Sequence, residues 1–201
     1  MTSENASSSS RGSTDNGGFN GFKFRVVLLG DARVGKTSVL RRFTENLFDE
    51  EYKQTIGTTF ASKDVSIISG DSETRNVRLV IWDMGGQETY RELRRQFMKG
   101  AAGAIIVYDV TRPETFMAMN NWFESFRETC PDAEVVLAAN KTDLEEARMV
   151  PREPGHMLRD WFQAPYYETS AKTGTAVVDV FKEMATLILE RKLQEQRDTA
   201  M

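Results

Sequence analysis

Residues 30–37 form a glycine-rich run whose residue types and spacing are typical of a phosphate-binding loop. Gly30 and Gly35 stand five residues apart and are followed by Lys36 and the hydroxyl residue Thr37. Between a strand and a helix, such a loop aims backbone N–H groups and the positive helix end at phosphate oxygens. We expect Lys36 to reach the outer phosphates and Thr37 to ligate magnesium. The alternative is a glycine-rich turn without a ligand.

A second set of polar residues begins at Asp83, which ends a predicted strand and precedes Met84-Gly85-Gly86-Gln87. An aspartate at the mouth of a strand beside a phosphate loop can hold magnesium through water. Gly86 supplies a backbone N–H for a terminal phosphate, and Gln87 supplies an amide that can orient an attacking water. On its own, Asp83 also fits a helix cap or a turn.

Two further polar loops follow predicted strands. Asn140-Lys141-Thr142-Asp143 comes after one strand, and Ser170-Ala171-Lys172 comes after the next. In an open α/β sheet both loops lie at the ligand-binding edge. A carboxylate such as Asp143 accepts hydrogen bonds from the N1–H and N2–H₂ groups of guanine, and adenine lacks that pair of donors. Taken alone, residues 140–143 also fit a surface turn.

Alternating strand and helix patterns predict an α/β fold, a single doubly wound, mostly parallel six-stranded sheet flanked by helices. Continuous apolar runs are typical of parallel strands buried on both faces. A turn-forming cluster at residues 69–72 joins two β-rich runs into an antiparallel hairpin at one sheet edge. The predicted strands span residues 24–29, 60–68, 76–82, 102–109, 134–139 and 165–168. The predicted helices span residues 36–45, 113–129, 152–162 and 175–194.

The chain has 201 residues, a length that favours one domain. We expect this domain at residues 22–192, between a disordered Ser/Gly-rich N-terminal tail (1–21) and a short flexible C-terminal tail (193–201). The formal net charge of -4 gives no electrostatic case for binding nucleic acid. Cys130 is the only cysteine, which excludes an internal disulfide and fits a reducing intracellular compartment. No secretion signal or bilayer-spanning stretch is present in the sequence.

In order and spacing these motifs resemble those of Ras-superfamily small GTPases, most closely the Rab family, over about Phe22 to Lys192. The resemblance implies a GTPase domain that binds GTP or GDP with Mg²⁺ and hydrolyses GTP slowly, with Gln87 as the catalytic residue. It implies a regulator of vesicle traffic. It also implies that Thr37, Thr55 and Asp83 hold the magnesium ion, and that Phe48 covers the base. The implied nucleotide-binding residues are Asp31, Ala32, Arg33, Val34, Gly35, Lys36, Thr37, Ser38, Phe48, Thr55, Gly86, Asn140, Lys141, Asp143, Ser170, Ala171 and Lys172.

The Rab likeness itself comes from Thr55-Ile56-Gly57 with Phe60, from Trp82, and from residues 100–109. Phe60, Trp82 and Phe97 resemble the aromatic triad through which Rab proteins present their switch segments to effectors. For each ring the alternative is packing in the core, and for Trp82 this alternative is nearly as well supported as a role in effector binding. The resemblance implies a monomer whose switch loops bind a guanine-nucleotide exchange factor, a GTPase-activating protein and effectors.

Some residues depart from the family pattern. Ala32 stands where Ras proteins have glycine and leaves less room near the terminal phosphate, and Gly85 stands where alanine is usual and makes a looser hinge. The C-terminal stretch contains no cysteine for prenylation, so we expect no direct lipid anchor. We therefore expect a cytoplasmic protein that reaches endomembranes through partners or through a longer, prenylated natural chain. Residues 145–156 suggest no function, and His156 fits a surface or half-buried helix position.

Two other functions fit parts of the sequence. The phosphate loop alone also fits a metabolic phosphotransferase or an ATPase, but Asp143 and the lack of an acceptor-substrate domain argue against that class. A GTP-binding scaffold with negligible turnover fits the presence of Ala32 and Gly85.

Overall fold

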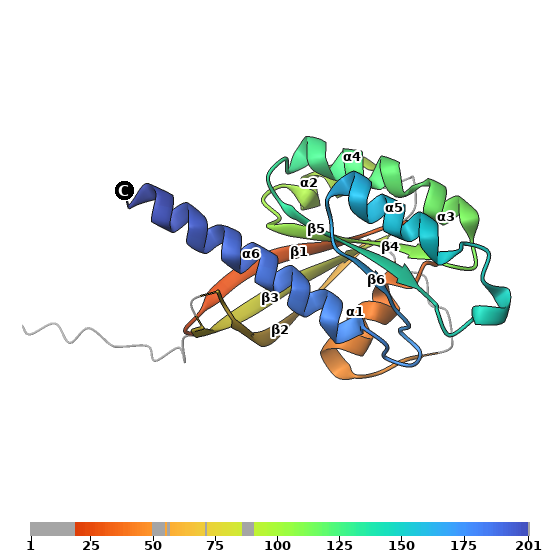
Figure 1. Ribbon diagram of the computed structural model, residues 1–201, viewed down its shortest axis with the longest axis horizontal. Coiled ribbons are helices and arrows are strands. Elements are labelled where there is room, and N and C mark those ends of the chain that lie inside the picture. The colour runs from red at the N-terminus through yellow and green to blue at the C-terminus, as the bar shows by residue number, and fades with distance from the viewer. Residues whose placement is uncertain (1–18, 50–54, 56, 71, 86–90, 201) are drawn as a thin grey trace, which may run out of the picture.

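The computed structural model describes residues 19–49, 55, 57–70, 72–85 and 91–200. Within these residues, six strands form one sheet in the order β2-β3-β1-β4-β5-β6 (Figure 1). Strand β2 is antiparallel to β3, and all other neighbours are parallel, which confirms the predicted α/β sheet with a hairpin at one edge. The strands are β1 (Phe22–Leu29), β2 (Thr58–Ile68), β3 (Thr74–Met84), β4 (Gly103–Asp109), β5 (Glu134–Asn140) and β6 (Tyr166–Glu168).

Helices cover both faces of this sheet (Figure 1). One core joins α1 and α6 to one face, where Phe43 stacks on Phe181 with ring centroids 4.0 Å apart. The other core packs helices α2, α3, α4 and α5 against the opposite face, where Phe123 stacks on Phe162, also at 4.0 Å. The helices are α1 (Lys36–Glu45), α2 (Arg91–Met98), α3 (Pro113–Met117), α4 (Met119–Thr129), η2 (Glu145–Ala147), α5 (Arg152–Phe162) and α6 (Val177–Thr199).

The central strands are apolar on both sides because each face carries a helical layer. Every residue of β4 is buried, and in β5 only Glu134 is partly exposed. Because β1, β4 and β5 are parallel neighbours, their carboxyl ends meet at one edge of the sheet, where the loops that follow them lie together. That edge positions all of the polar motifs found in the sequence.

The predicted helix at residues 113–129 is wrong as a single element, because it divides at Ala118 into α3 and α4. The residues around Ala118 carry no glycine or proline signal for a break. Phe116, in α3, lies edge-on to Tyr108 at 5.4 Å, and Met119, in α4, is buried in the same core. The backbone of Ala118 is itself helical, so the break is one residue wide and the two helices pack against the same face of the sheet.

The last helix also differs from its prediction. Helix α6 ends at Thr199 and so includes residues 193–199, which the sequence assigned to a flexible tail (Figure 1). Side chains one turn apart support the extra length, since Arg191 and Lys192 both pair with Glu195, and Gln194 donates to Asp198. The remaining predicted boundaries shift by one or two residues at most. Most of the predicted N-terminal tail lies outside the described residues.

Candidate functional site

The phosphate-binding loop connects β1 to α1, as the sequence predicts. Gly30 and Gly35 have φ angles of 131° and 97°. A Cβ atom at Gly30 would collide with the carbonyl oxygen of Val107, and one at Gly35 with the amide of Asn140. Only glycine satisfies both requirements at these two positions. Arg33 also has a positive φ, of 67°, which is a strained conformation for a residue with a Cβ atom.

Lys36 opens helix α1, and its side chain turns back over the loop. Its Nζ donates to the carbonyl oxygens of Gly30 at 2.7 Å and Asp31 at 2.8 Å, and the residue is 6% exposed. Ser38, in the first turn of the same helix, is half-buried. The ammonium group is therefore held at the centre of the loop, where a phosphate group would meet it.

A cluster of oxygen atoms lies beside the loop. The hydroxyl of Thr37 is 2.8 Å from the hydroxyl of Thr55 and donates to the carboxylate of Asp83. Asp83 is fully buried in β3, and its Oδ1 has no hydrogen-bond partner among the described residues. Burial raises the pKa of this carboxyl above its ordinary value, although the Thr37 hydrogen bond and the charge of Lys36 act in the opposite direction. A hydroxyl pair with one buried carboxylate fits the hard oxygen ligands that magnesium prefers.

The loops after β5 and β6 meet at Asn140, which is 1% exposed. Its amide nitrogen donates to the carbonyl oxygen of Val34 in the phosphate loop at 2.9 Å. Its amide oxygen accepts from the backbone N–H of Ala171 at 3.2 Å and from the hydroxyl of Thr169 at 3.3 Å. One buried side chain thus joins three loops that are far apart in the sequence.

A second set of bonds orders the same region. The hydroxyl of Ser170 donates to Oδ1 of Asp143 at 2.6 Å, and the backbone N–H of Thr142 donates to the carbonyl of Thr169 at 3.1 Å. From α1, Arg42 donates to the carbonyl oxygens of Ala171 at 2.8 Å and Lys172 at 2.7 Å. The two base-binding motifs predicted from the sequence are therefore one structural unit.

Sequence reasoning missed Asp109, the last residue of β4. Asp109 is fully buried, and its carboxylate pairs with Nζ of Lys141 at 2.6 Å. Its other oxygen accepts from the backbone N–H and the hydroxyl of Thr111 at 2.9 and 2.7 Å. The sequence did contain a signal for this residue: Asp109 is an aspartate at the carboxyl end of a predicted central strand, the same edge at which the other motifs were expected.

The other predicted site residues divide between described and undescribed parts of the chain. Phe48 is half-buried and packs against the core that α1 and α6 form on one face of the sheet. Gly86 and Gln87 lie outside the described residues. The neighbouring Gly85 is described, and its N–H donates to the carbonyl of Gly57 at 3.1 Å, linking the two segments that flank the site.

Phe60, Trp82 and Phe97 form a continuous row on the β2–β3 side. Trp82 is half-buried between the other two rings, with centroids 6.3 Å from Phe60 and 5.3 Å from Phe97. Phe60 is 75% exposed. Arg25 lies over the Trp82 ring at 5.1 Å. Trp82 therefore packs against its neighbours while the row reaches the surface at Phe60.

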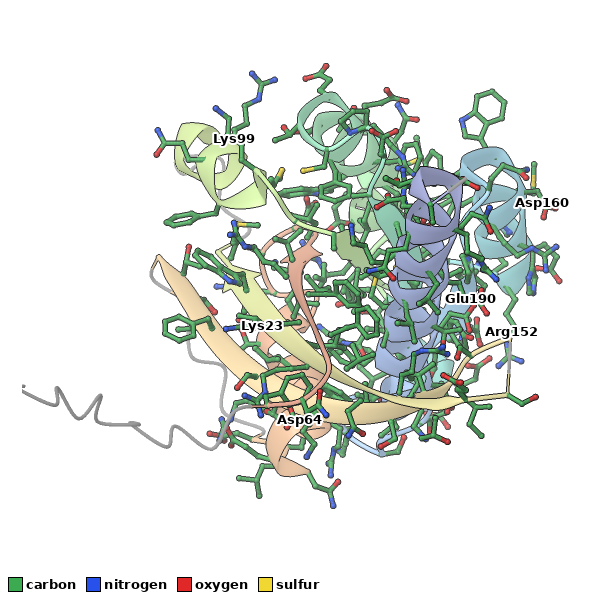
Figure 2. The ribbon with its side chains drawn as sticks, turned by 90° about the vertical axis from the view of Figure 1, so that its left-hand side faces the viewer. Lys23, Asp64, Lys99, Arg152, Asp160 and Glu190 are labelled. Atoms are coloured by element: carbon green, nitrogen blue, oxygen red, sulfur yellow. The ribbon has the colours of Figure 1, made fainter. Side chains whose placement is uncertain are left out.

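Residues 145–156 support the end of strand β6. Arg148 makes two hydrogen bonds to the carboxylate of Glu168, at 3.0 and 3.2 Å, and Arg152 contacts the same carboxylate at 3.1 Å. Figure 2 shows Arg152 and Asp160, both on α5, on one side of the molecule. His156 is exposed and lies edge-on to Tyr166 at 5.3 Å. This confirms its predicted surface position.

Comparisons with known proteins agree with this geometry. Residues 25–190 match the model of the Ras family. The chain is 40% identical to the Ras-related protein RABA1b of Arabidopsis thaliana over 168 residues, which cover 83% of this chain and 76% of that protein. It is likewise 40% identical to the Ras-related protein Rab11D of Lotus japonicus, over 83% of this chain and 75% of that protein. With its phosphate loop, buried oxygen cluster and joined base loops, the chain belongs to the Ras family, as a Rab-like small GTPase.

Proposed function

We propose an assignment of roles to the residues with which this Rab-like GTPase binds and hydrolyses GTP. As a Rab-like member of its family, the chain is a small GTP-binding protein that acts in membrane trafficking. The observation that carries the assignment is the junction at Asn140, because it ties the loop of Asp143 to the phosphate loop through Val34. A nucleotide whose base meets Asp143 thereby has its phosphates at Lys36.

In this proposal the base contacts come from Asn140, Lys141, Asp143, Ser170, Ala171 and Lys172, with Phe48 along the edge of the base. Asp143 accepts from the N1–H and N2–H₂ groups of guanine, which gives selectivity against adenine. The phosphate contacts come from Lys36 and from the backbone N–H groups of the loop and of the start of α1, residues 31–38. Gly86 adds a further N–H for the terminal phosphate.

Thr37, Thr55 and Asp83 are the proposed magnesium ligands, with Asp83 acting through water. The ion supplies positive charge that neutralises the phosphate oxygens. The unpartnered Oδ1 of the buried Asp83 supports this role, since a buried carboxylate oxygen without a donor is costly unless a ligand meets it.

Gln87 is the proposed catalytic residue and orients the attacking water. Residues 49–59 and 85–97 are the proposed switch segments, since Thr55 and Gly86 can contact magnesium and the terminal phosphate only when GTP is bound. We propose that an exchange factor, a GTPase-activating protein and effectors recognise these segments, with the Phe60–Trp82–Phe97 row as part of the effector surface.

Nucleotide preference and single-turnover hydrolysis, measured on one purified sample of residues 1–201, test this assignment. The expected result is binding of GDP and GTP in preference to ADP and ATP, with slow hydrolysis that Gln87→Leu slows further. Gln163→Leu, an exposed glutamine at the end of α5, is the matched control. Equal affinity for ATP and GTP would contradict the role of Asp143, and unchanged hydrolysis in Gln87→Leu would contradict the role of Gln87.

Hydrogen exchange tests the switch segments. Residues 49–59 and 85–97 are expected to exchange more slowly with a non-hydrolysable GTP analogue than with GDP. Identical exchange of both segments with the two nucleotides would mean that the chain is not a switch.

A further inference from the structure

Two side chains from the segment that follows β4 donate hydrogen bonds to residues of the phosphate loop. The indole N–H of Trp122, on α4, donates to Oδ1 of Asp31 at 2.7 Å. The guanidinium of Arg112, which precedes α3, donates to the carbonyl oxygen of Ala32 at 3.0 Å. The two contacts join adjacent residues of the loop to positions 80 and 91 residues further along the chain.

Both donors stand on ordered backbone. Arg112 is the N-cap residue of α3, its N–H donates to Asp109, and its carbonyl accepts from the buried hydroxyl of Thr115 at 2.7 Å. Trp122 lies within α4 and packs against the core on that face of the sheet. The positions of the two donors are therefore set by the fold, independently of the loop that they contact.

The chemistry of the loop explains why such contacts are needed. A phosphate-binding loop turns its N–H groups toward the ligand, so its carbonyl oxygens need other partners. Lys36 donates to two of them, and Arg112 donates to that of Ala32. The carboxylate of Asp31 lies in the same loop, and a negative charge that moved toward bound phosphates would repel them. A neutral donor makes a stronger hydrogen bond to an ionised carboxylate than to an uncharged acceptor. Here the bond from the Trp122 indole holds the Asp31 carboxylate toward α4.

We propose that Trp122 and Arg112 are positioning residues for the nucleotide phosphates. Trp122 keeps the Asp31 carboxylate away from the phosphates, and Arg112 keeps the Ala32 peptide turned outward. Together they slow the release of the nucleotide. The inference rests on the proposed function, because it concerns the same phosphate site.

The test measures the release of GDP carrying a fluorescent ribose label from the full chain. Trp122→Phe keeps an aromatic ring and removes the N–H, and it is expected to speed release about tenfold. Asp31→Ala should cancel this effect, because the charge that the indole restrains is then absent. A purely structural role for Trp122 predicts equal acceleration with and without Asp31, and that result, or unchanged release in Trp122→Phe, would overturn the proposal.

Matched variants separate this effect from a general loss of stability. Trp161 is 78% exposed on α5, so Trp161→Phe should leave release unchanged. Arg112→Met is expected to speed release about threefold, whereas Arg159→Met, which removes an exposed arginine from α5, should not. Equal release from Arg112→Met and the unmodified chain would overturn the role of Arg112.

A second measurement covers the case in which Trp122→Phe fails to fold. The chain has three tryptophans, whose indole N–H groups give separate proton resonances. Asp31→Ala should shift the Trp122 resonance and leave that of Trp161 in place, and an unmoved Trp122 resonance would contradict the contact. Unmodified protein that retains no guanine nucleotide would overturn the proposed function itself, whereas retained nucleotide with unaltered release in the variants overturns only this inference.

Discussion

Asn140 in the proposed base half of the site and Asp83 in the proposed phosphate half are both buried polar side chains, yet they differ in what surrounds them. Asn140 has protein partners for both its amide nitrogen and its amide oxygen, on two other loops. Asp83 has a hydrogen bond from Thr37 at one oxygen and no partner among the described residues at the other. The first side chain stabilises the fold, and the second costs folding free energy.

The same contrast extends to neighbouring residues. In the base half, Asp109 and Lys141 neutralise each other, and Ser170 donates to Asp143. Backbone strain does not separate the halves, because Arg33 and Lys141 both hold a left-handed conformation, with φ angles of 67° and 71°. The difference lies in the side chains: those of the base half pair with one another and stabilise the fold, whereas Asp83 keeps one buried carboxylate oxygen without a partner among the described residues.

The largest expected effect is that of Asn140→Ala, which removes the junction of the three loops. It leaves the carbonyl of Val34 and the N–H of Ala171 without this partner, and should lower the free energy of unfolding by about 3–5 kcal/mol. Urea denaturation of both proteins without bound nucleotide measures the loss, because Asn140 is also a proposed base contact and GDP would add its own stabilisation. A destabilisation below about 1 kcal/mol would contradict the claim that the contacts of Asn140 stabilise the fold.

Asp143→Asn is expected to act on binding more than on folding. It removes the acceptor pair for guanine and should weaken GTP binding by about 100-fold, close to 3 kcal/mol, while xanthosine triphosphate binds better. Competition between the two nucleotides for the unmodified and variant proteins provides the measurement. Asp160→Asn, on the exposed end of α5, serves as the control, because it makes the same chemical change away from the site.

Asp83→Asn should stabilise the protein by about 1 kcal/mol at neutral pH while abolishing the effect of magnesium on nucleotide release. Burial raises the pKa of Asp83, so the folded state binds a proton more tightly than the unfolded state does. The stability linked to this proton is present at low pH and is lost as the pH rises through the raised pKa. The variant therefore gains stability at pH 7, and the gain should shrink on acidification. A loss of stability in the variant at pH 7 would contradict the claim that the buried Asp83 carboxylate costs folding free energy.

The smallest expected effect is that of Arg33→Gly. Glycine accepts the φ of 67° without strain, but it also gives the unfolded chain more freedom, so the net gain in stability should be about 0.5 kcal/mol. Thermal unfolding with saturating GDP detects such a change. Gln163→Gly is an informative partner, since that residue also has a positive φ, of 51°, at the end of α5 and lies outside the site.

Local sequence patterns were sufficient to predict the elements that carry the motifs. Helix α1 and helix α5 begin and end where the patterns place them, and the strands differ by at most two residues at either end. The reason is that the phosphate loop, the apolar strands and the turn at residues 69–72 are each encoded by neighbouring residues. The one-residue division at Ala118 has no local signal in the sequence, and the continuation of α6 to Thr199 depends on paired side chains along an exposed helix, so neither could be predicted in the same way.

The sequence by itself determined the polar motifs of this protein: the glycine-rich loop 30–37, residues 140–143 and residues 170–172, each after a strand whose carboxyl end faces the same edge. Only the tertiary structure decided how these parts hold one another. The contacts of Asn140 with Val34, of Asp109 with Lys141 and of Trp122 with Asp31 join residues from different strands and helices. Such partners are chosen by strand order and by the packing of helices on the sheet, and no local pattern of residue types records that choice.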